Sequence, residues 1–459
     1  MVSDEFGSRI ASNTSSHLAI TVEDHSLDPS KQSMRILIEN SGYHLQNMGD
    51  VAMLQIAAQR IQSAFPTAEL RTLTHSPERL DRYVGGQPFD PRRRQLWLDS
   101  RALPIPIRKS WLSGSLGKSL AVAEERFQVG YPRLAAVSIR ALGGRNPKSN
   151  SQTSEFVSDI NSCDLVVVTG GGFLTDSFLS HANDVLTTLE LAQNLGKPTL
   201  MFGQGIGPLT CDRTLKRVGR ILAKVSHVGV REQKTGRAVL EQCGIEGSGN
   251  GKTQVVCTGD DAVQLAYDRR PAELGLALGI NLRMANYSGV TESQKQMVKI
   301  ELADFMQRHS IPAVVAPISY YGPEMDGAHV VEAMKSTPGF DSTIPEDCPE
   351  AIIDAVGKCR LVVTGSYHAG VFALSQGIPI IGLVASEYYK NKFLGLLDQF
   401  GDGCQIVNIT SANGSEQLRA AMELSYTRAP ELRDPLLTAA KRQVDVCNEF
   451  HQHAFRSHQ

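Results

Sequence analysis

The chain has 459 residues, of which 41% are hydrophobic and 20% are charged, and its formal net charge at pH 7 is -2. This composition indicates a globular protein of two domains and excludes one that binds nucleic acid over its whole surface. The eight cysteines include no Cys-x-x-Cys pair and no Cys/His grouping, which argues against zinc, an iron–sulfur cluster and a disulfide framework. We therefore expect a reduced, cytoplasmic compartment.

The first 33 residues are rich in Ser, Asp and Glu and lack the cationic start and apolar core of a signal peptide. We expect residues 1–33 to be a mostly disordered leader. No later apolar run approaches the length that a membrane-spanning helix needs.

The first domain is expected over residues 34–267 and opens with an apolar strand at 35–40. A helical pattern starts at Val51, so Asp50 lies at or near a helix N-cap and faces the end of that strand. A second strand follows Pro66. This β-α-β order is the usual start of a doubly wound domain.

Within this domain, residues 85–150 form a basic segment with twelve Arg and Lys residues against four Asp and Glu residues. We expect a helical insertion with Trp97 and Trp111 packed on the core and a solvated basic face. The alternative is a surface that rests on an anionic membrane, where Trp and Arg favour the interface.

Apolar, non-alternating segments in the second half of the first domain predict parallel strands that are buried on both faces. Two of them enter glycine loops, at 170–172 and 203–207. Glycines let a ligand approach the backbone, so Gly171, Gly172 and Gln204 are candidate ligand contacts, with tight strand-to-helix packing as the alternative. Neither loop is a G-x-G-x-x-G after the first strand, which argues against NAD.

The second domain is expected over residues 268–414, and its first residues, 268–275, are the candidate linker and contain Pro271. A helical tail is expected over 415–459. Both domains contain the order strand, Thr-Gly turn, small-residue helix, Gly-x-Pro and strand. Two similar Rossmann-like domains in tandem would produce such a repeated order of elements. The predicted fold class is therefore α/β with parallel sheets.

Cationic or potentially cationic residues follow several predicted strands: Arg231, Arg283 and His368, with Lys390 or Lys392 beyond a further strand. The carboxyl ends of parallel strands share one edge of a sheet, so these side chains can converge on a small, highly charged anion. A surface ion pair is the alternative for any one of them alone.

His368 lies in a turn between a strand and a helix. Beside a dianion its protonated form would donate a proton or stabilise charge, whereas the alternative is a structural histidine that hydrogen-bonds the turn. Asp50 and Asp176 lie at loop-helix junctions, where they are helix caps or, if the two domains face each other, general bases for a hydroxyl.

The order and spacing of these elements resemble the polysaccharide pyruvyl transferase family. The matching motifs are Asn40 to Asp50 after the first strand, Gly170-Gly171-Gly172 with Asp176, the loop 203–208, Val230-Arg231-Glu232, the strand ending in Arg283, and His368 with Gly377-Ile378-Pro379 and a downstream lysine. The resemblance covers residues 34–401. It implies two Rossmann-like domains that face each other across a cleft, as in GT-B glycosyltransferases.

The resemblance also implies transfer of the pyruvyl group of phosphoenolpyruvate to sugar hydroxyls as a ketal, in exopolysaccharide biosynthesis, without a metal or cofactor. Arg231, Arg283 and His368 would hold the donor, whose phosphate and carboxylate need several cations at once. Asp50 or Asp176 would assist the acceptor, a saccharide or lipid-linked saccharide at the inner face of the membrane.

One motif departs from the family pattern. Where members commonly have Arg-Leu-His, this chain has Ser366-Tyr367-His368, so one donor-binding cation is missing and Ser366 and Tyr367 become candidate donor contacts. The candidates to supply the charge are Lys390, Lys392 and Arg360. Two alternatives stay open: a GT-B glycosyltransferase that uses a nucleotide sugar, and a non-catalytic binding member of the family.

Overall fold

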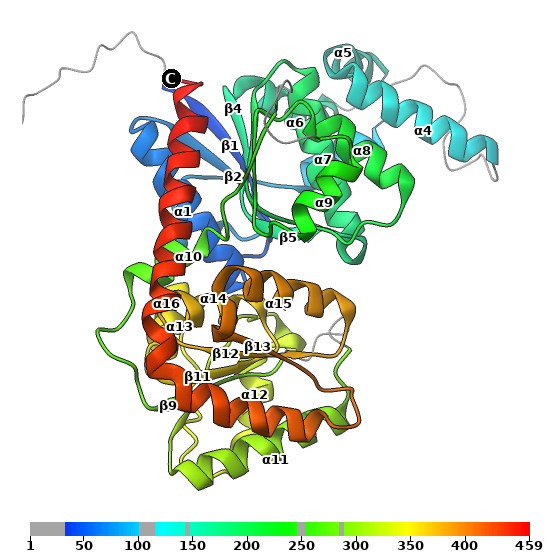
Figure 1. The fold of residues 1–459 in the computed structure, drawn as a ribbon. Coiled ribbons are helices and arrows are strands. Elements are labelled where there is room, and N and C mark those ends of the chain that lie inside the picture. The colour runs from blue at the N-terminus through cyan, green and yellow to red at the C-terminus, as the bar shows by residue number, and fades with distance from the viewer. Residues whose placement is uncertain (1–32, 101–114, 143–146, 246–252, 284–288) are drawn as a thin grey trace, which may run out of the picture. The chain divides into compact units, whose positions relative to one another are not determined.

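The computed structural model describes residues 33–100, 115–142, 147–245, 253–283 and 289–459 (Figure 1). Residues 34–459 cluster as one unit. The leader expected over residues 1–33 lies outside the described residues except for Ser33, and so does Trp111. Among the described residues, no helix combines the length and the apolarity that crossing a bilayer requires.

The first domain is built on an eight-stranded sheet with the order β3-β2-β1-β4-β6-β7-β8, in which β5 also pairs with β6. All of its pairings are parallel. The strands are β1 (Arg35–Glu39), β2 (Glu69–Leu73), β3 (Gln87–Phe89), β4 (Leu165–Val168), β5 (Gly171–Leu174), β6 (Thr199–Ile206), β7 (His227–Val230) and β8 (Gln254–Cys257).

A second parallel sheet has the order β10-β9-β11-β12-β13. Its strands are β9 (Ala277–Asn281), β10 (Ala313–Val315), β11 (Cys359–Thr364), β12 (Ile380–Val384) and β13 (Cys404–Asn408). In each sheet the strand order reverses once, between β1 and β4 and between β9 and β11. Ligands of open α/β sheets bind beyond the carboxyl ends of the strands at such reversals.

Helices connect the strands of both sheets. In the first domain they are α1 (Met48–Ala64), α2 (Pro77–Tyr83), α3 (Arg92–Asp99), α4 (Ser115–Gly130), α5 (Pro132–Leu142), α6 (Pro147–Ser162), α7 (Leu179–Asn194), α8 (Asp212–Leu222), α9 (Thr235–Gln242) and α10 (Ala262–Asp268). In the second they are α11 (Glu292–His309), α12 (Asp326–Met334), α13 (Pro349–Val356), α14 (Tyr367–Ser375) and α15 (Glu387–Phe400), followed by α16 (Gly414–Arg456).

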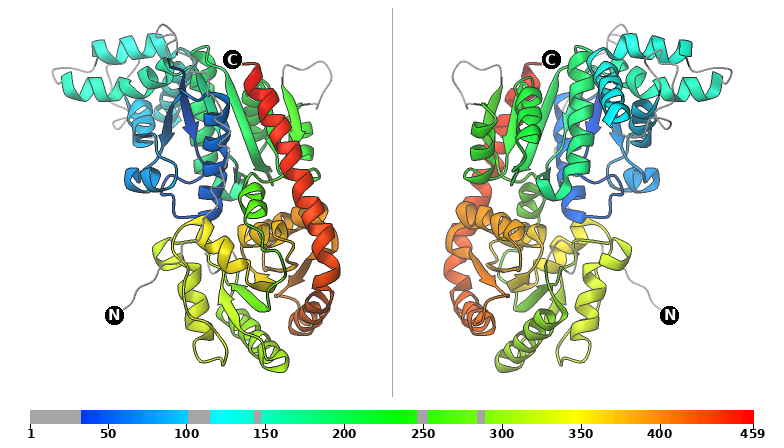
Figure 2. Two further views of the ribbon diagram at one scale, coloured as in Figure 1. Left: turned by 90° about the vertical axis from the view of Figure 1, so that its left-hand side faces the viewer. Right: turned by 90° about the vertical axis from the view of Figure 1, so that its right-hand side faces the viewer.

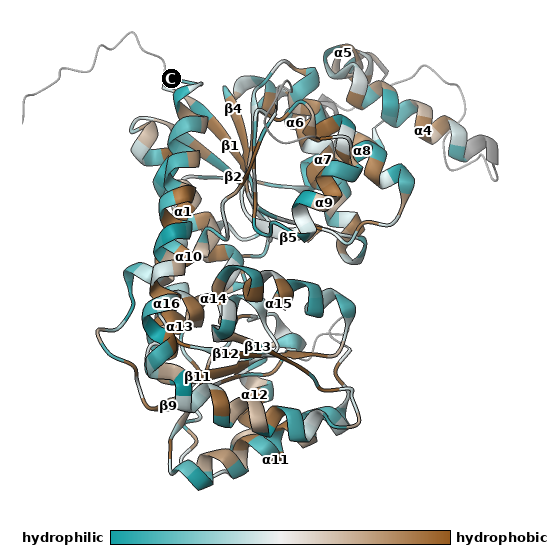
Figure 3. Cartoon of the chain, in the orientation of Figure 1, coloured by the Kyte–Doolittle hydropathy of each residue, from teal (hydrophilic) through white to brown (hydrophobic). Residues whose placement is uncertain are grey.

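The strands are buried on both faces, as their non-alternating apolar sequences predict. In β4, Leu165 and Val167 pack in the cluster that contains α1, while Val166 packs on the opposite side with Trp97 and Ile160. Figure 3 shows the strands of both sheets as largely hydrophobic. Each sheet is therefore covered by helices on both faces.

Asp50 lies near the N-cap of α1, as expected, in the first turn of the helix. The N-cap itself is Asn47, whose side chain accepts the backbone N–H groups of Gly49 and Asp50. One local expectation is corrected by the structure. The basic segment 85–150 is not purely helical, because β3 extends the sheet edge before α3 begins. Trp97 is fully buried, as expected for packing on the core.

The last helix, α16, does not stay with the second domain. It packs against α11 and β13 near its start and against α10, α1 and β7 further along. Figures 1 and 2 show it running from the second sheet to the first, in orange and red. The C-terminal helix therefore joins the two domains on the side of α1 and α10.

Candidate active site

A cavity of about 330 Å³ lies between the strand ends of the two sheets. We call it the main cavity. Its first-domain wall consists of Ser41, Gly42, Asn47, Asp50, Gly172, Phe173, Phe178, His181 and Arg231. Its second-domain wall consists of Arg283, Ile318, Tyr321, Glu324, Ser366, Tyr367, His368, Tyr388, Tyr389 and Lys392. The two domains face each other here, as the sequence predicts.

Arg231 follows β7 and is almost fully buried. Its Nη1 donates a hydrogen bond of 2.9 Å to Asp260, and its guanidinium lies 4.6 Å from the ring centroid of Tyr367 in the other domain. Gly172 and Gly205 leave room for it, since a Cβ at either position would lie 2.7 or 2.4 Å from Nη2. A carboxylate, an aromatic face and two glycines thus fix the position of this arginine.

Arg283 follows β9 and is held in a similar way. Its Nη1 donates a hydrogen bond of 3.0 Å to Asp326, and its Nη2 lies 3.7 Å from a Glu324 oxygen. The fully buried Asp326 also accepts the backbone N–H groups of Ile318 and Ser319. Each arginine therefore has a buried carboxylate behind it that orients the guanidinium.

His368 lies in the first turn of α14, with its Nε2 3.5 Å from Oδ2 of Asp260. Asp260 belongs to the first domain, so this contact joins the two domains across the cavity. Burial opposes ionisation of Asp260, but His368 and Arg231 outweigh it and hold the pKa of the carboxyl well below its usual range. Asp260 therefore stays negative beside Arg231 and His368.

Lys392 lies on α15 and is partly buried. Its ammonium lies 4.4 Å from the ring centroid of Tyr388 and 5.9 Å from those of Tyr367 and Tyr389. Burial, and then the charge of Arg231, lower the pKa of Lys392 to about 7. The main cavity therefore contains a lysine that changes charge near neutral pH.

The unusual Ser366-Tyr367 pair also lines the main cavity. Ser366 is the N-cap residue of α14, and its backbone N–H donates to Thr364 Oγ1 at 2.8 Å. The Tyr367 hydroxyl is buried without a hydrogen-bond partner among the described residues, and burial raises its pKa well above the ordinary value. The arginine position of the family pattern is thus a serine here, and the neighbouring leucine position is a tyrosine whose ring packs against Arg231.

The structure brings together most of the residues singled out from the sequence. Those that line the main cavity are Asp50, Gly172, Arg231, Arg283, Ser366, Tyr367, His368 and Lys392. The others lie elsewhere, and each has a structural contact that accounts for it.

Asp176 accepts hydrogen bonds from the N–H and hydroxyl of Thr210, which fixes a turn. Gln204 is fully buried and donates to the carbonyl of Thr169. Gly171 packs so tightly that a Cβ would lie 2.4 Å from Cβ of Ser41.

Two cations that were candidates to replace the missing arginine also lie outside the main cavity. Lys390 is exposed and pairs with Glu387 at 3.2 Å. Arg360 donates to the carbonyl of Tyr426 on α16. Of the three candidates, only Lys392 lines the main cavity.

Sequence reasoning did not single out the carboxylates behind the arginines, Asp260 and Asp326, or the aromatic wall of Phe173, Phe178 and His181. Asp260 follows β8, the neighbour of β7, and the register pairs Val230 with Cys257. Arg231 and Asp260 thus lie just beyond the ends of two paired strands, and this position could have predicted their contact.

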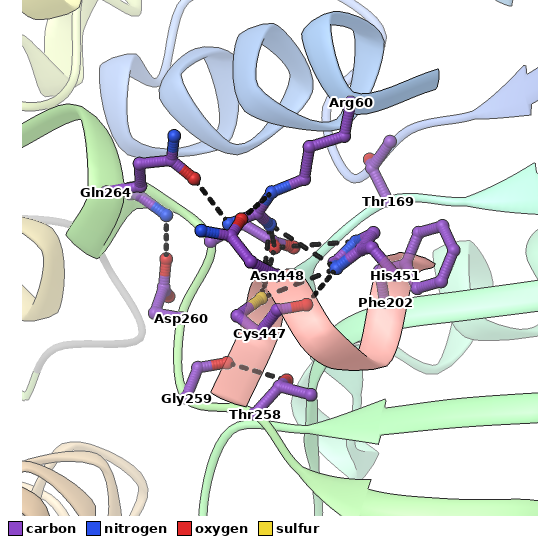
Figure 4. A network of polar contacts seen from close by, with 12 residues as sticks. Arg60, Thr169, Phe202, Thr258, Gly259, Asp260, Gln264, Cys447, Asn448 and His451 are labelled. Atoms are coloured by element: carbon purple, nitrogen blue, oxygen red, sulfur yellow. Dashed lines mark hydrogen bonds and ion pairs between the residues drawn. The ribbon is translucent and has the colours of Figure 1, made fainter. Parts of the chain in front are cut away.

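A second group of polar side chains joins α16 to the first domain (Figure 4). Asp261, Cys447 and His451 are buried and close enough together to hold a metal ion. However, Nη1 of Arg60 lies 2.5 Å from Asp261 Oδ1, 3.1 Å from Cys447 Sγ and 3.4 Å from His451 Nδ1. The guanidinium thus occupies the position between the three donors, so this group is an arginine-centred clamp.

Solved structures of similar fold share little sequence with the chain. A candidate UDP-N-acetylglucosamine 2-epimerase from Listeria monocytogenes has a TM-score of 0.52 and 10% identity over 90% of this chain and 95% of its own. The UDP-GlcNAc 2-epimerase of Neisseria meningitidis, bound to UDP-GlcNAc, has a TM-score of 0.50 and 10% identity, and the match covers 90% of this chain and 99% of its own. Phytolacca americana UGT2, complexed with UDP-2fluoro-glucose and pterostilbene, has a TM-score of 0.50 and 12% identity, and the match covers 92% of this chain and 99% of its own. These likenesses show a GT-B fold.

No curated protein matches the chain. The family model described as polysaccharide pyruvyl transferase matches residues 47–387, which include every residue of the main cavity except Ser41, Gly42, Tyr388, Tyr389 and Lys392. The chain therefore belongs to the polysaccharide pyruvyl transferase family, a family of transferases.

Proposed function

We propose that this protein transfers the pyruvyl group of phosphoenolpyruvate to hydroxyl groups of a saccharide as a ketal. The observation that carries the proposal is the meeting of Arg231, Arg283, Lys392 and His368 at one cavity between the domains. A three-carbon molecule with a phosphate and a carboxylate needs several cations within a short distance. Family members commonly have an arginine at the position of Ser366, and in this chain Lys392 supplies that positive charge.

The chemistry needs an acid for the donor and a base for the acceptor. His368 protonates the methylene carbon of phosphoenolpyruvate, and the positive charge that develops at the adjacent carbon attracts a saccharide hydroxyl. Asp50 accepts the proton of that hydroxyl. Phosphate leaves with the electrons of its C–O bond. A second hydroxyl of the saccharide then attacks the same carbon and gives its proton to the imidazole of His368, which closes the ketal.

A glycosyltransferase reaction with a nucleotide sugar is the second candidate, because the two UDP-bound structures above share the fold. It would require a base-binding pocket in the second domain. The apolar pocket there, between Leu282, Val298, Leu383 and Ile409, has a volume of about 20 Å³. That is close to the space of one water molecule, so the part of this pocket that the described residues line does not accommodate a nucleotide base.

Calorimetry on the whole protein separates the candidates. We expect binding of phosphoenolpyruvate, no binding of UDP-glucose, and loss of phosphoenolpyruvate binding in Arg231→Ala and His368→Ala. Lys390→Ala is the matched control, because it removes a nearby cation that is outside the main cavity. Absence of phosphoenolpyruvate binding to the unmutated protein would remove the proposal. Binding without release of phosphate in the presence of any saccharide would leave a binding member of the family.

We further propose that the acceptor is presented at an anionic membrane surface, as a lipid-linked saccharide. Tyr131, Leu134 and Val137 are 62%, 61% and 65% exposed at the start and along one side of α5. Arg133 and Arg140 are exposed on the same helix. Figures 1 and 2 show α4 and α5 projecting from the first sheet. Exposed apolar side chains flanked by arginines are typical of a surface that rests on anionic lipid.

A further inference from the structure

A second cavity of about 300 Å³ adjoins the main cavity. Gly172, Arg231, Tyr388 and Lys392 line both cavities, so these residues form a shared wall. The second cavity extends from this wall towards the end of β6 and the start of α9. Its remaining lining consists of Gly205, Ile206, Gly207, Pro208, Glu232, Lys234, Thr235, Ala238, Val239 and Asn391.

Two of the three cations that line the second cavity are paired with carboxylates, and the third is Lys392 of the shared wall. The ammonium of Lys234 lies 2.5 Å from Asp398, and Arg231 is bonded to Asp260. The buried carboxylate of Glu232 lies 3.7 Å from Nε of Arg231, which has no hydrogen-bond partner among the described residues. The second cavity therefore has a buried carboxylate and a guanidinium nitrogen without a hydrogen-bond partner side by side in its wall.

The other lining groups suit an uncharged, hydroxyl-rich molecule. Thr235 and Asn391 can donate and accept hydrogen bonds, and Tyr388 presents an aromatic ring. A volume of about 300 Å³ is at the lower end of the usual range of roughly 300–1,000 Å³ for ligand pockets. One or two sugar rings match this combination better than a phosphate does.

We propose that the second cavity is the subsite for the acceptor saccharide, with Glu232 and Asn391 as hydrogen-bonding partners and the reacting hydroxyl directed at the shared wall. This inference rests on the proposed function, because it assigns the donor to the main cavity. It makes Lys392 and Tyr388 the residues that lie between donor and acceptor.

The experiment fills the second cavity without touching the main one. Ala238 is exposed at the rim, so Ala238→Trp blocks the cavity with little effect on folding. Ala420→Trp, at an exposed position of α16, is the matched control. The probes are methyl β-galactoside, methyl α-mannoside and methyl β-glucoside, measured by saturation-transfer NMR, and phosphoenolpyruvate, measured by calorimetry. Asn391→Ala tests the same subsite by removing a hydrogen-bonding group.

We expect the unmutated protein and Ala420→Trp to show saturation transfer to at least one glycoside. Ala238→Trp should lose most of that signal and Asn391→Ala should weaken it severalfold, while the affinity of both variants for phosphoenolpyruvate stays within about twofold. Unchanged glycoside signals in Ala238→Trp, or no signal in the unmutated protein, would overturn the inference. If the donor assignment is wrong but the subsite is right, the protein will not bind phosphoenolpyruvate. It will still bind a glycoside, and Ala238→Trp will still abolish that binding.

Discussion

Gly49 and His368 touch across the two domains: a Cβ atom on Gly49 would lie 2.0 Å from Cγ of His368. Gly49 is in the first turn of α1, and His368 is in the first turn of α14. The loop before α1 is bound to the second domain at the same place, because the N–H of Met48 donates to the carbonyl of Ile318 at 2.9 Å. The absence of a side chain at position 49 therefore lets the histidine lie between the domains.

Replacing Gly49 by Ala should lower activity by displacing His368. Because real Cβ contacts do not approach 2.0 Å, the imidazole or the whole helix must move. A shift of about 1 Å at a reacting group costs about 100-fold in rate, so we expect a loss of that order in kcat for pyruvyl transfer. The rate at which free phosphate is released from phosphoenolpyruvate in the presence of a saccharide acceptor measures this kcat.

Gly130→Ala is the control for this prediction. Gly130 ends α4 with no atom within 4 Å of an added Cβ, so its activity should equal that of the unmutated protein. Equal activities of Gly49→Ala and Gly130→Ala would show that the contact with His368 does not matter for the reaction.

The charge of Lys392 should make donor binding depend on pH. Its pKa is lowered to about 7, so the side chain is mostly protonated at pH 6 and mostly neutral at pH 8.5. Affinity for phosphoenolpyruvate should therefore fall as pH rises through 7. A lost charge-assisted contact is worth about 1.5–3 kcal/mol, or about 10- to 150-fold in Kd. Calorimetry at both pH values measures the change.

Two variants isolate this effect from the titration of the donor itself. Lys392→Arg stays charged over the whole range and should flatten the pH dependence, whereas Lys390→Met should leave it as it is. A pH dependence that survives in Lys392→Arg would assign the titration to another group.

Several site residues could be predicted because strand exits share an edge of a sheet. Arg231, Arg283 and His368 each follow a parallel strand, and they do converge. Lys390 and Lys392 could not be told apart, because the helix that carries them was not assigned. Residues two apart on a helix point about 200° apart, so only one of them can face the cavity. The assignment of α15 settles which.

The roles of Asp176 and Gln204 could not be read from the sequence for a related reason. A carboxylate at a loop-helix junction suits catalysis and turn formation equally, and only the position of Thr210 distinguishes them. Likewise, the expectation of no Cys/His grouping rested on spacing along the sequence, which does not reveal a third residue from a distant element. Cys447 and His451 lie one helical turn apart and meet Asp261 only after α16 returns to the first domain.

Arg60 should be needed to keep α16 on the first domain. Its guanidinium binds Asp261, Cys447 and Gln264 in a buried position. Arg60→Met leaves the Asp261 carboxylate buried without its partner, which costs about 3–5 kcal/mol. We expect a lower urea midpoint and faster amide exchange over the last part of α16.

Arg428→Met provides the comparison for Arg60→Met. Arg428 forms a more exposed pair with Glu431 at 3.4 Å on the same helix, and such pairs contribute less than about 1 kcal/mol. Similar midpoints for the two variants would show that the clamp does not stabilise the protein.

The exposed side of α5 should bind anionic vesicles. Burial of Leu134 and Val137 at the lipid interface would contribute roughly 1.5–3 kcal/mol each, and Arg133 would add attraction to negative headgroups. We expect sedimentation with phosphatidylglycerol vesicles, weak sedimentation with phosphatidylcholine vesicles, and a decrease as salt rises. Leu134→Glu with Val137→Glu should reduce binding about tenfold or more. Leu424→Glu, at a leucine that is 49% exposed on α16, should bind like the unmutated protein. If the unmutated protein sediments equally with both lipids or with neither, α5 is only a solvated helix and the acceptor need not be presented at a membrane.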